Sequence, residues 1–440
     1  MRVSFFVIFL LFTVLQFANA DDWPQWLGPQ RDSVWREKGI VDRFPANGLK
    51  VKWRMPVELG YSGPAVAGNK VYVFDYAKTS GAATNNPGGR DRLEGKERVR
   101  CLAADTGKRI WKHEYDCSYN ISYPGGPRCT PTVDSGRVYT LGAEGNLLCL
   151  DANSGDVIWG KELKKEYETD TPIWGFAAHP LVVGNLLYCV VGGKGSVAVA
   201  FDKKNGREVW RALSNKEPGY CPPTLIEHAG VTQLLIWHPE AINSLNPMTG
   251  AVHWSINLKP AYGMSVTAPR KSGNYLFASG IGNVGALIEL SNSEPAAEVK
   301  WQGNSKSALY SCNSTPFIEG DVIYGNDCGT GKLIAARIED GKRLWETLEP
   351  TSGGERRASH GTAYLVKHED RYFIASETGD LILAKLSPEG YKEISRFRML
   401  DPTNECFGRD VVWSHPAFAR RCVFARNDKE VVCVSLAAGD

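Results

Sequence analysis

The chain has 440 residues, and its 51 Lys and Arg side chains nearly balance its 49 Asp and Glu side chains. This balance argues against a nucleic-acid-binding protein, because such proteins present a strongly basic face. The 45 Gly residues and the 10% aromatic content are typical of an all-β protein with many turns.

Residues 1–20 have the order of parts found in a secretory signal peptide. Met1-Arg2 is positively charged, an uncharged apolar run follows from Val3 to Phe17, and Ala18-Asn19-Ala20 gives the small-x-small pattern before a cleavage site. We therefore expect an exported protein, periplasmic or secreted, with no membrane span after cleavage, since the apolar run is shorter than the ~20 residues of a span. An uncleaved N-terminal anchor is the alternative.

A short motif with Gly four residues before Trp recurs along the chain. The copies are Gly107 to Trp111, Gly155 to Trp159, Gly206 to Trp210, Gly250 to Trp254 and Gly341 to Trp345. Each Gly marks a hairpin turn that requires positive φ, and the alternating residues on either side predict two strands. The Trp side chains that we expect to dock each sheet on its neighbour are Trp53, Trp111, Trp159, Trp210, Trp254, Trp301 and Trp345.

A second signature, usually ending in Pro, marks the first strand of each repeat. It occurs eight times, ending at Pro64, Pro131, Pro180, Thr224, Pro269, Pro316, Ala363 and Pro416. Because seven outer strands follow these eight starts, Val51 to Arg54 supplies the missing one. The sequence predicts an eight-bladed β-propeller with four-stranded blades over residues 51–440, closed by pairing of this strand with Val431 to Leu436. Residues 21–50 are expected to be a leader that packs on one face of the ring, and a β-solenoid is the alternative fold.

The eleven Cys residues of an exported chain raise the question of disulfides, and their odd number leaves at least one unpaired. A two-residue turn at Asn427-Asp428 would place Cys422 directly opposite Cys433, within disulfide reach. Cys117 with Cys129 and Cys312 with Cys328 are weaker candidates. Buried free thiols are the alternative for all of these pairs.

The repeat resembles the outer-strand motif A-x-D-x-x-T-G-x-x-x-W of the pyrroloquinoline-quinone (PQQ)-like β-propeller family. Asp151 and Asp202 match the Asp of that motif, whereas Ala297 replaces the Gly before Trp301 and Ile394 stands at the Trp position of the seventh repeat. The resemblance implies the propeller fold. It leaves function open, because this superfamily contains both quinone-dependent dehydrogenases and non-catalytic scaffolds. The opening segment, residues 22–29, is also similar to a group of exported bacterial propeller proteins of this size.

A quinone dehydrogenase needs cations for the cofactor carboxylates, oxygen ligands for calcium and a carboxylate base. Candidates stand on the loops that lead into the inner strands, with Asp410 as the candidate catalytic base. The candidate ligand-binding residues are Arg128, Asp170, Trp174, His360, Arg409 and Trp413. A solvated rim of the propeller channel would have the same composition. The sequence contains no adjacent Cys-Cys pair and no Cys-x-x-Cys-His haem motif.

No metal site is predicted. His179 and His415 occupy the same repeat position but lie three blades apart, so we expect them to be too distant for one metal. His360 and His415, on adjacent blades, are the better pair.

These patterns favour an exported, non-catalytic propeller that acts as a protein-interaction or envelope-assembly scaffold, with another envelope or extracellular protein as its partner. The functional analogue that it resembles is the propeller subunit of the outer-membrane β-barrel assembly machinery. A soluble quinone-dependent alcohol or sugar dehydrogenase, with PQQ and calcium, is the alternative. A glycan-binding propeller that uses Trp174, Trp413 and the loop from Tyr119 to Tyr123 is the second alternative.

Overall fold

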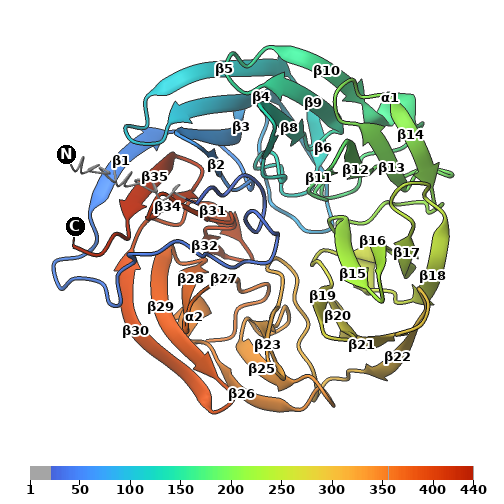
Figure 1. Ribbon diagram of the computed structural model, residues 1–440. Coiled ribbons are helices and arrows are strands. Elements are labelled where there is room, and N and C mark those ends of the chain that lie inside the picture. The colour runs from blue at the N-terminus through green and yellow to red at the C-terminus, as the bar shows by residue number, and fades with distance from the viewer. Residues whose placement is uncertain (1–20, 355, 440) are drawn as a thin grey trace, which may run out of the picture.

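The computed structural model describes residues 21–354 and 356–439, so the predicted signal peptide lies outside the described residues. Eight antiparallel sheets are arranged as blades around a central axis (Figure 1). Each blade has four strands, and blade 1 carries one additional short strand. No helix among the described residues is long and apolar enough to cross a membrane. The predicted eight-bladed propeller is confirmed.

The strands follow one another outward from the axis in blades 1 to 7. Blade 1 contains β2 (Ala65–Ala67), β3 (Lys70–Ser80), β4 (Asp91–Ala103) and β5 (Arg109–Asp116), with β6 (Tyr119–Ile121) paired to β4. Blade 2 contains β7 (Thr132–Asp134), β8 (Arg137–Leu141), β9 (Asn146–Asp151) and β10 (Val157–Glu162). Blade 3 contains β11 (Leu181–Val183), β12 (Leu186–Val190), β13 (Ala198–Asp202) and β14 (Glu208–Ala212). Blade 4 contains β15 (Thr224–His228), β16 (Val231–His238), β17 (Ala241–Leu245) and β18 (Val252–Asn257).

The second half of the ring repeats this order. Blade 5 contains β19 (Arg270–Ser272), β20 (Tyr275–Gly280), β21 (Val284–Leu290) and β22 (Ala297–Gln302). Blade 6 contains β23 (Phe317–Glu319), β24 (Val322–Asn326), β25 (Leu333–Arg337) and β26 (Arg343–Thr347). Blade 7 contains β27 (Ala363–His368), β28 (Arg371–Ser376), β29 (Asp380–Ser387) and β30 (Gly390–Arg398). The short helices α1 (Leu163–Glu166), η1 (Ala261–Gly263) and α2 (Glu349–Ser352) and the hairpin of β31 (Asn404–Cys406) with β32 (Arg409–Val411) lie between blades.

Blade 8 closes the ring with strands from both ends of the described chain. It contains β33 (Ala417–Ala419), β34 (Cys422–Arg426) and β35 (Glu430–Ser435), and its outer strand is β1 (Val51–Pro56). Strand β1 pairs antiparallel with β35, with Trp53 opposite Cys433. The predicted closure is confirmed, and it covers the strand edge that an open array would expose.

The register of blade 8 corrects the predicted cysteine geometry. Arg426 pairs with Val431, so the connection has four residues, and Cys422 lies opposite Ser435 rather than Cys433. The longer turn forms because the Asn427 side chain accepts hydrogen bonds from the backbone N–H groups of Lys429 and Glu430. All eleven cysteines are free thiols in the structure.

Blade 1 also differs from expectation at its hairpin. The Gly- and Asn-rich polar composition of residues 77–96 is typical of a loop, but β3 extends to Ser80 and β4 begins at Asp91. Leu93, 0% exposed, packs in a small cluster with Tyr76 and Tyr119. The extended part of this hairpin therefore has a small apolar cluster of its own.

The repeated Trp and Gly form one packing unit across five of the blade boundaries. A Cβ on Gly155 of blade 2 would lie 2.5 Å from the ring of Trp111 in blade 1, and Gly155 has φ of +80°. Trp111 Nε1 also donates a hydrogen bond of 3.2 Å to the carbonyl of Ala152 in blade 2. The same arrangement joins Trp53 with Gly107, Trp159 with Gly206, Trp210 with Gly250 and Trp301 with Gly341. The Gly is therefore required twice, for its conformation and for the space that the Trp fills.

The two irregular repeats of the sequence explain two irregular boundaries. Blade 5 lacks the Gly, and Trp254 of blade 4 donates to Gln233 Oε1 within its own blade instead of to a carbonyl of blade 5. Blade 7 lacks the Trp, and the ring of Phe397 takes its place, because a Cβ on Gly48 would lie 3.1 Å from it. Each missing half of the pair has a local substitute.

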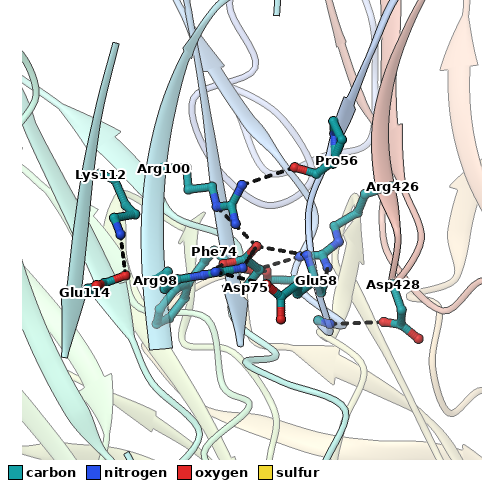
Figure 2. Close-up of polar contacts among 12 residues, drawn as sticks. Pro56, Glu58, Phe74, Asp75, Arg98, Arg100, Lys112, Glu114, Arg426 and Asp428 are labelled. Carbon is teal, nitrogen blue, oxygen red and sulfur yellow. Dashed lines mark hydrogen bonds and ion pairs between the residues drawn. The ribbon is translucent and has the colours of Figure 1, made fainter. Parts of the chain in front are cut away.

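A buried charge network joins blades 8 and 1 at the seam (Figure 2). Asp75, fully buried, receives two hydrogen bonds of 2.8 Å from Arg98. Arg100 Nε lies 3.3 Å from the same carboxylate. Arg426 of blade 8, also fully buried, donates to the carbonyls of Phe74 and Glu58. Removal of one partner would leave uncompensated charge in the core.

The Trp–Gly unit predicts a difference between two glycines of blade 2. Gly155→Ala should destabilise the protein by about 1–3 kcal/mol more than Gly136→Ala, because the new methyl group must displace Trp111. Gly136 is the matched control, since it has φ of +76° and open space around its Cβ position. Urea unfolding of both variants measures the difference, and equal losses would contradict the packing role.

The seam predicts a second difference. Asp75→Asn should cost about 3–5 kcal/mol of unfolding free energy, since it leaves buried arginines without their carboxylate. Glu114→Gln, which breaks the solvent-exposed contact to Lys112 on β5 (Figure 2), should cost only about 0–1 kcal/mol. A small loss for Asp75→Asn in thermal or urea unfolding would show that the seam does not depend on this charge.

Candidate functional site: a channel closed at one end

A cavity of about 580 Å³ lies on the ring axis, which is within the range of small-ligand pockets, roughly 300–1,000 Å³. Its walls are the loops that enter the inner strands and the first residues of those strands. Most of the lining is apolar or aromatic, and Arg128 is the only Lys or Arg among the described lining residues. The aromatic lining residues are Trp26, Tyr61, Tyr123, Trp174, Tyr220, Tyr262, Tyr364, Phe407 and Trp413.

The leader closes one end of this cavity. In Figure 1 the blue segment that follows the grey trace crosses toward the middle of the ring. Trp26 stacks on His179 with ring centroids 4.8 Å apart, and its Nε1 donates to His415 Nε2 at 3.3 Å. The Arg31 guanidinium lies over the Trp26 ring and donates to the carbonyl of Pro180. Burial lowers the pKa of Arg31 to about 10.

Backbone contacts tie the leader to blades on all sides of the channel. Trp23 pairs with Val66 of blade 1, and Trp35 N–H donates to the carbonyl of Lys367 of blade 7. Arg270 of blade 5 donates to the carbonyl of Asp32 at 2.7 Å. The leader therefore spans the channel and forms its floor.

The opposite end of the cavity is a mouth with exposed aromatic residues. Tyr262, on η1 between blades 4 and 5, is 80% exposed, and Phe407, in the β31–β32 turn, is 42% exposed. The tip of the β3–β4 hairpin reaches over to this side, where Asn85 Nδ2 donates to the carbonyl of Glu405. The mouth is thus built from loops that lie far apart in the sequence.

Four of the seven predicted site residues line the cavity: Arg128, Trp174, His360 and Trp413. Asp170 is exposed and lies in a separate surface groove with Glu168 and Lys194. Arg409 is turned away, since its guanidinium pairs with the buried Glu377 at 2.8 Å. Asp410 is exposed on β32 opposite Glu405 and is not among the cavity-lining residues.

The described lining residues do not fit PQQ with calcium. They include no Asp or Glu, so the cavity wall offers neither a carboxylate ligand for calcium nor a carboxylate base. Arg128 is already used as a brace, because it donates to the carbonyls of Trp174, Ser122, Tyr123 and Gly126. A tricarboxylate would find no free guanidinium among these residues.

The structure corrects the expected histidine geometry. The rings of His179 and His415 lie 6.3 Å apart, because the channel is narrow enough for blades three steps apart to face one another. Both histidines are hydrogen-bond acceptors, His415 from Trp26 and His179 Nδ1 from the Thr130 N–H at 3.0 Å. They therefore hold the leader in place as neutral rings.

His360 lies beside Cys312 and Cys328, for which the sequence predicted only a possible pairing with each other. Its Nδ1 lies 3.2 Å from Cys312 Sγ and 3.5 Å from Cys328 Sγ. A hydrogen bond between the two thiols lowers the pKa of Cys328 and raises that of Cys312. In the sequence, Cys312 and Cys328 stand on either side of one repeat start, and this spacing indicated that the two thiols could meet. No spacing rule connects them with His360, which lies in the connection to the following blade.

The neutral histidines predict a pH-dependent stability. Burial lowers the pKa of His415 to about 3 and that of His179 well below its usual range, so only the unfolded chain binds these protons between pH 6.5 and 4. Stability should be complete above pH 6.5 and fall as the pH drops, by up to about 1.4 kcal/mol per unit and histidine. Partial exposure of His415 reduces the effect below this limit. We therefore expect His415→Gln to make the stability profile less steep by about 1 kcal/mol per pH unit. Parallel profiles for the two proteins in urea unfolding would contradict this assignment.

Comparison with known proteins places this ring in a family. Residues 95–347 and 238–440 match the family described as outer membrane protein assembly factor BamB. The outer membrane protein assembly factor BamB of Shewanella oneidensis is 22% identical over 285 residues, which are 60% of this chain and 70% of that protein.

Two solved structures share the fold. BamB from Moraxella catarrhalis has a TM-score of 0.56 at 17% identity and covers 88% of this chain and 97% of its own. Quinohemoprotein alcohol dehydrogenase from Comamonas testosteroni has a TM-score of 0.58 at 13% identity, over 95% of this chain and 81% of its own. The resemblance to PQQ-like propellers is confirmed, and the chain belongs to the outer membrane protein assembly factor BamB family.

Proposed function

We propose that this chain is an exported, non-catalytic propeller that serves as an assembly scaffold in the cell envelope. The observation that carries the proposal is the cavity of a BamB-family ring in which no described lining residue is an Asp or Glu and the lining arginine is already fully used. Such a cavity has the apolar aromatic surface of a recognition site and lacks the groups of a dehydrogenase site.

The mouth of the cavity is the proposed partner-binding face. Tyr262 and Phe407 expose large apolar surface there, and Trp174 and Trp413 lie behind them at the cavity wall. Aromatic side chains are enriched among residues that dominate binding energy at protein interfaces. The leader occupies the other end, so a partner segment enters from the mouth. The partner would be an envelope protein with an exposed apolar segment, such as a nascent outer-membrane protein or a component that assembles one.

The glycan-binding alternative receives less support from the same residues. Tyr119 is 2% exposed, and its hydroxyl donates to the buried Glu97, so it has no free ring face for a sugar. Trp174 and Trp413 line the cavity, but both are packed in side-chain contacts with other aromatic residues.

A photo-crosslinking amino acid at position 262 tests the proposed face in the intact cell envelope. We expect Tyr262 replaced by the crosslinker to capture an outer-membrane protein or an assembly component, identified by mass spectrometry. Met248 is the matched control, since it is 66% exposed but lies before the start of β18, whereas Tyr262 follows its end, roughly 20 Å away at ~3.3 Å per residue.

Equal capture at both positions, or none at either, would contradict a partner site at the mouth. Titration of the purified protein with PQQ, with and without calcium, tests the alternative. Saturable calcium-dependent binding would overturn the proposal of a non-catalytic ring.

A further inference from the structure

The two thiols and the imidazole at the rim of the cavity have the arrangement of a metal-binding site. Among the described residues, Cys312, Cys328 and His360 are the one group of three His, Cys, Asp or Glu side chains whose ligand atoms all lie within 4.8 Å of one another. A tetrahedral ion about 2.3 Å from sulfur and 2.0–2.1 Å from nitrogen requires S···S near 3.8 Å and S···N near 3.6 Å. The S···N distances of 3.2 and 3.5 Å lie close to these values.

The three ligands come from three separate connections that meet at blade 6. Cys312 precedes its inner strand β23, Cys328 lies between β24 and β25, and His360 lies in the connection to blade 7. The backbone joins them directly, because the His360 N–H donates to the carbonyl of Cys328 at 2.7 Å. The site is therefore held by the fold of one blade boundary.

The backbone conformation of His360 and the stacking of its ring set the direction of the imidazole. Its φ is +57°, in the left-handed region that non-glycine residues rarely adopt. The imidazole stacks on Phe407 with centroids 4.7 Å apart and an interplanar angle of 7°.

The donor set and the cavity define the kind of ion and the open position. Cys312 and His360 line the cavity, and Met264 lines it too while packing against the Cys312–Cys328 cluster. Thiolate, imidazole and thioether donors select soft ions such as Cu⁺ and Zn²⁺. We propose that Cys312, Cys328 and His360 bind one Cu⁺ or Zn²⁺ ion, with the fourth coordination position facing the cavity and Met264.

The test uses the reduced, metal-free full chain and three probes. Competition with chromophoric chelators measures Cu⁺ and Zn²⁺ affinity, and Co²⁺ reports thiolate charge-transfer and tetrahedral ligand-field bands. We expect one equivalent of Cu⁺ or Zn²⁺ to bind, and His360→Gln and Cys328→Ser each to weaken binding at least about 100-fold, beyond the 10–100-fold typical of losing an outer-shell partner.

The double variant Cys422→Ser/Cys433→Ser is the matched control, because these two thiols interact with each other in blade 8 without a histidine. It should leave affinity and Co²⁺ spectra unchanged. Met264→Leu, which preserves volume, should weaken Cu⁺ more than Zn²⁺ binding. Absence of binding, binding that survives His360→Gln, or a Cys312–Cys328 disulfide in the protein isolated from the envelope would overturn the proposal.

Discussion

Strand β1 completes blade 8 with residues from the opposite end of the described chain, and every other feature depends on that closure. At five boundaries the Trp of one blade packs on a Gly of the next, and one of these pairs is Trp53 of β1 with Gly107. A ring without β1 would lose that contact and expose the edge of β35. Closure also decides where the channel runs. The inner strands can face one another across a narrow axis only when all eight sheets are in place.

Buried charges reinforce the boundary between blades 8 and 1, in addition to the Trp53–Gly107 contact. Asp75, Arg98 and Arg426 form a buried network between blade 1 and blade 8, the blade that is completed by strands from both ends of the described chain. Such a network adds specificity of register, because a slipped β1–β35 pairing would move the carbonyls of Pro56 and Glu58 away from Arg100 and Arg426. The leader adds a second tie by crossing the channel between Trp23 and Trp35. Stability and the shape of the cavity are thus set by the same contacts.

The sequence predicts the ring well because its signals are local and repeated. Five Gly-to-Trp copies predict hairpins within single blades, and eight inner-strand starts, most of them ending in Pro, predict the number of blades. The contacts that the sequence does not predict join residues of blades or segments that are far apart in the chain and close in the folded ring. His179 and His415 meet because the channel is narrow, and Phe397 replaces a Trp by reaching Gly48, a residue more than three hundred positions away.

The candidate site is predicted only in part, for a related reason. Arg128, Trp174, His360 and Trp413 line the cavity because loops entering inner strands form one rim. Asp410 and Arg409 belong to the same loops, yet the β31–β32 hairpin turns Asp410 outward and the buried Glu377 captures Arg409. The position of a residue on one of these loops predicts which face of the ring it lies on, but it does not predict whether its side chain points into the cavity.

The chemistry of this cavity follows from which groups are buried with partners and which reach its wall. The carboxylates near the rim, such as Glu377 and Glu97, are occupied by Arg409, Trp413 and tyrosine hydroxyls, so they stabilise loops and do not face the cavity. Cys312 and His360 line the cavity, and the Cys328 thiol lies 3.5 Å from the His360 ring. The contacts that hold neighbouring blades together are Trp–Gly pairs at the outer strands, away from the cavity. The charged lining of an oxidoreductase can therefore be absent from a propeller without a change in blade packing. Because blade packing does not depend on the rim loops, these loops can carry the exposed aromatic residues proposed to bind a protein partner. They can also carry the thiol and imidazole groups of the proposed metal site.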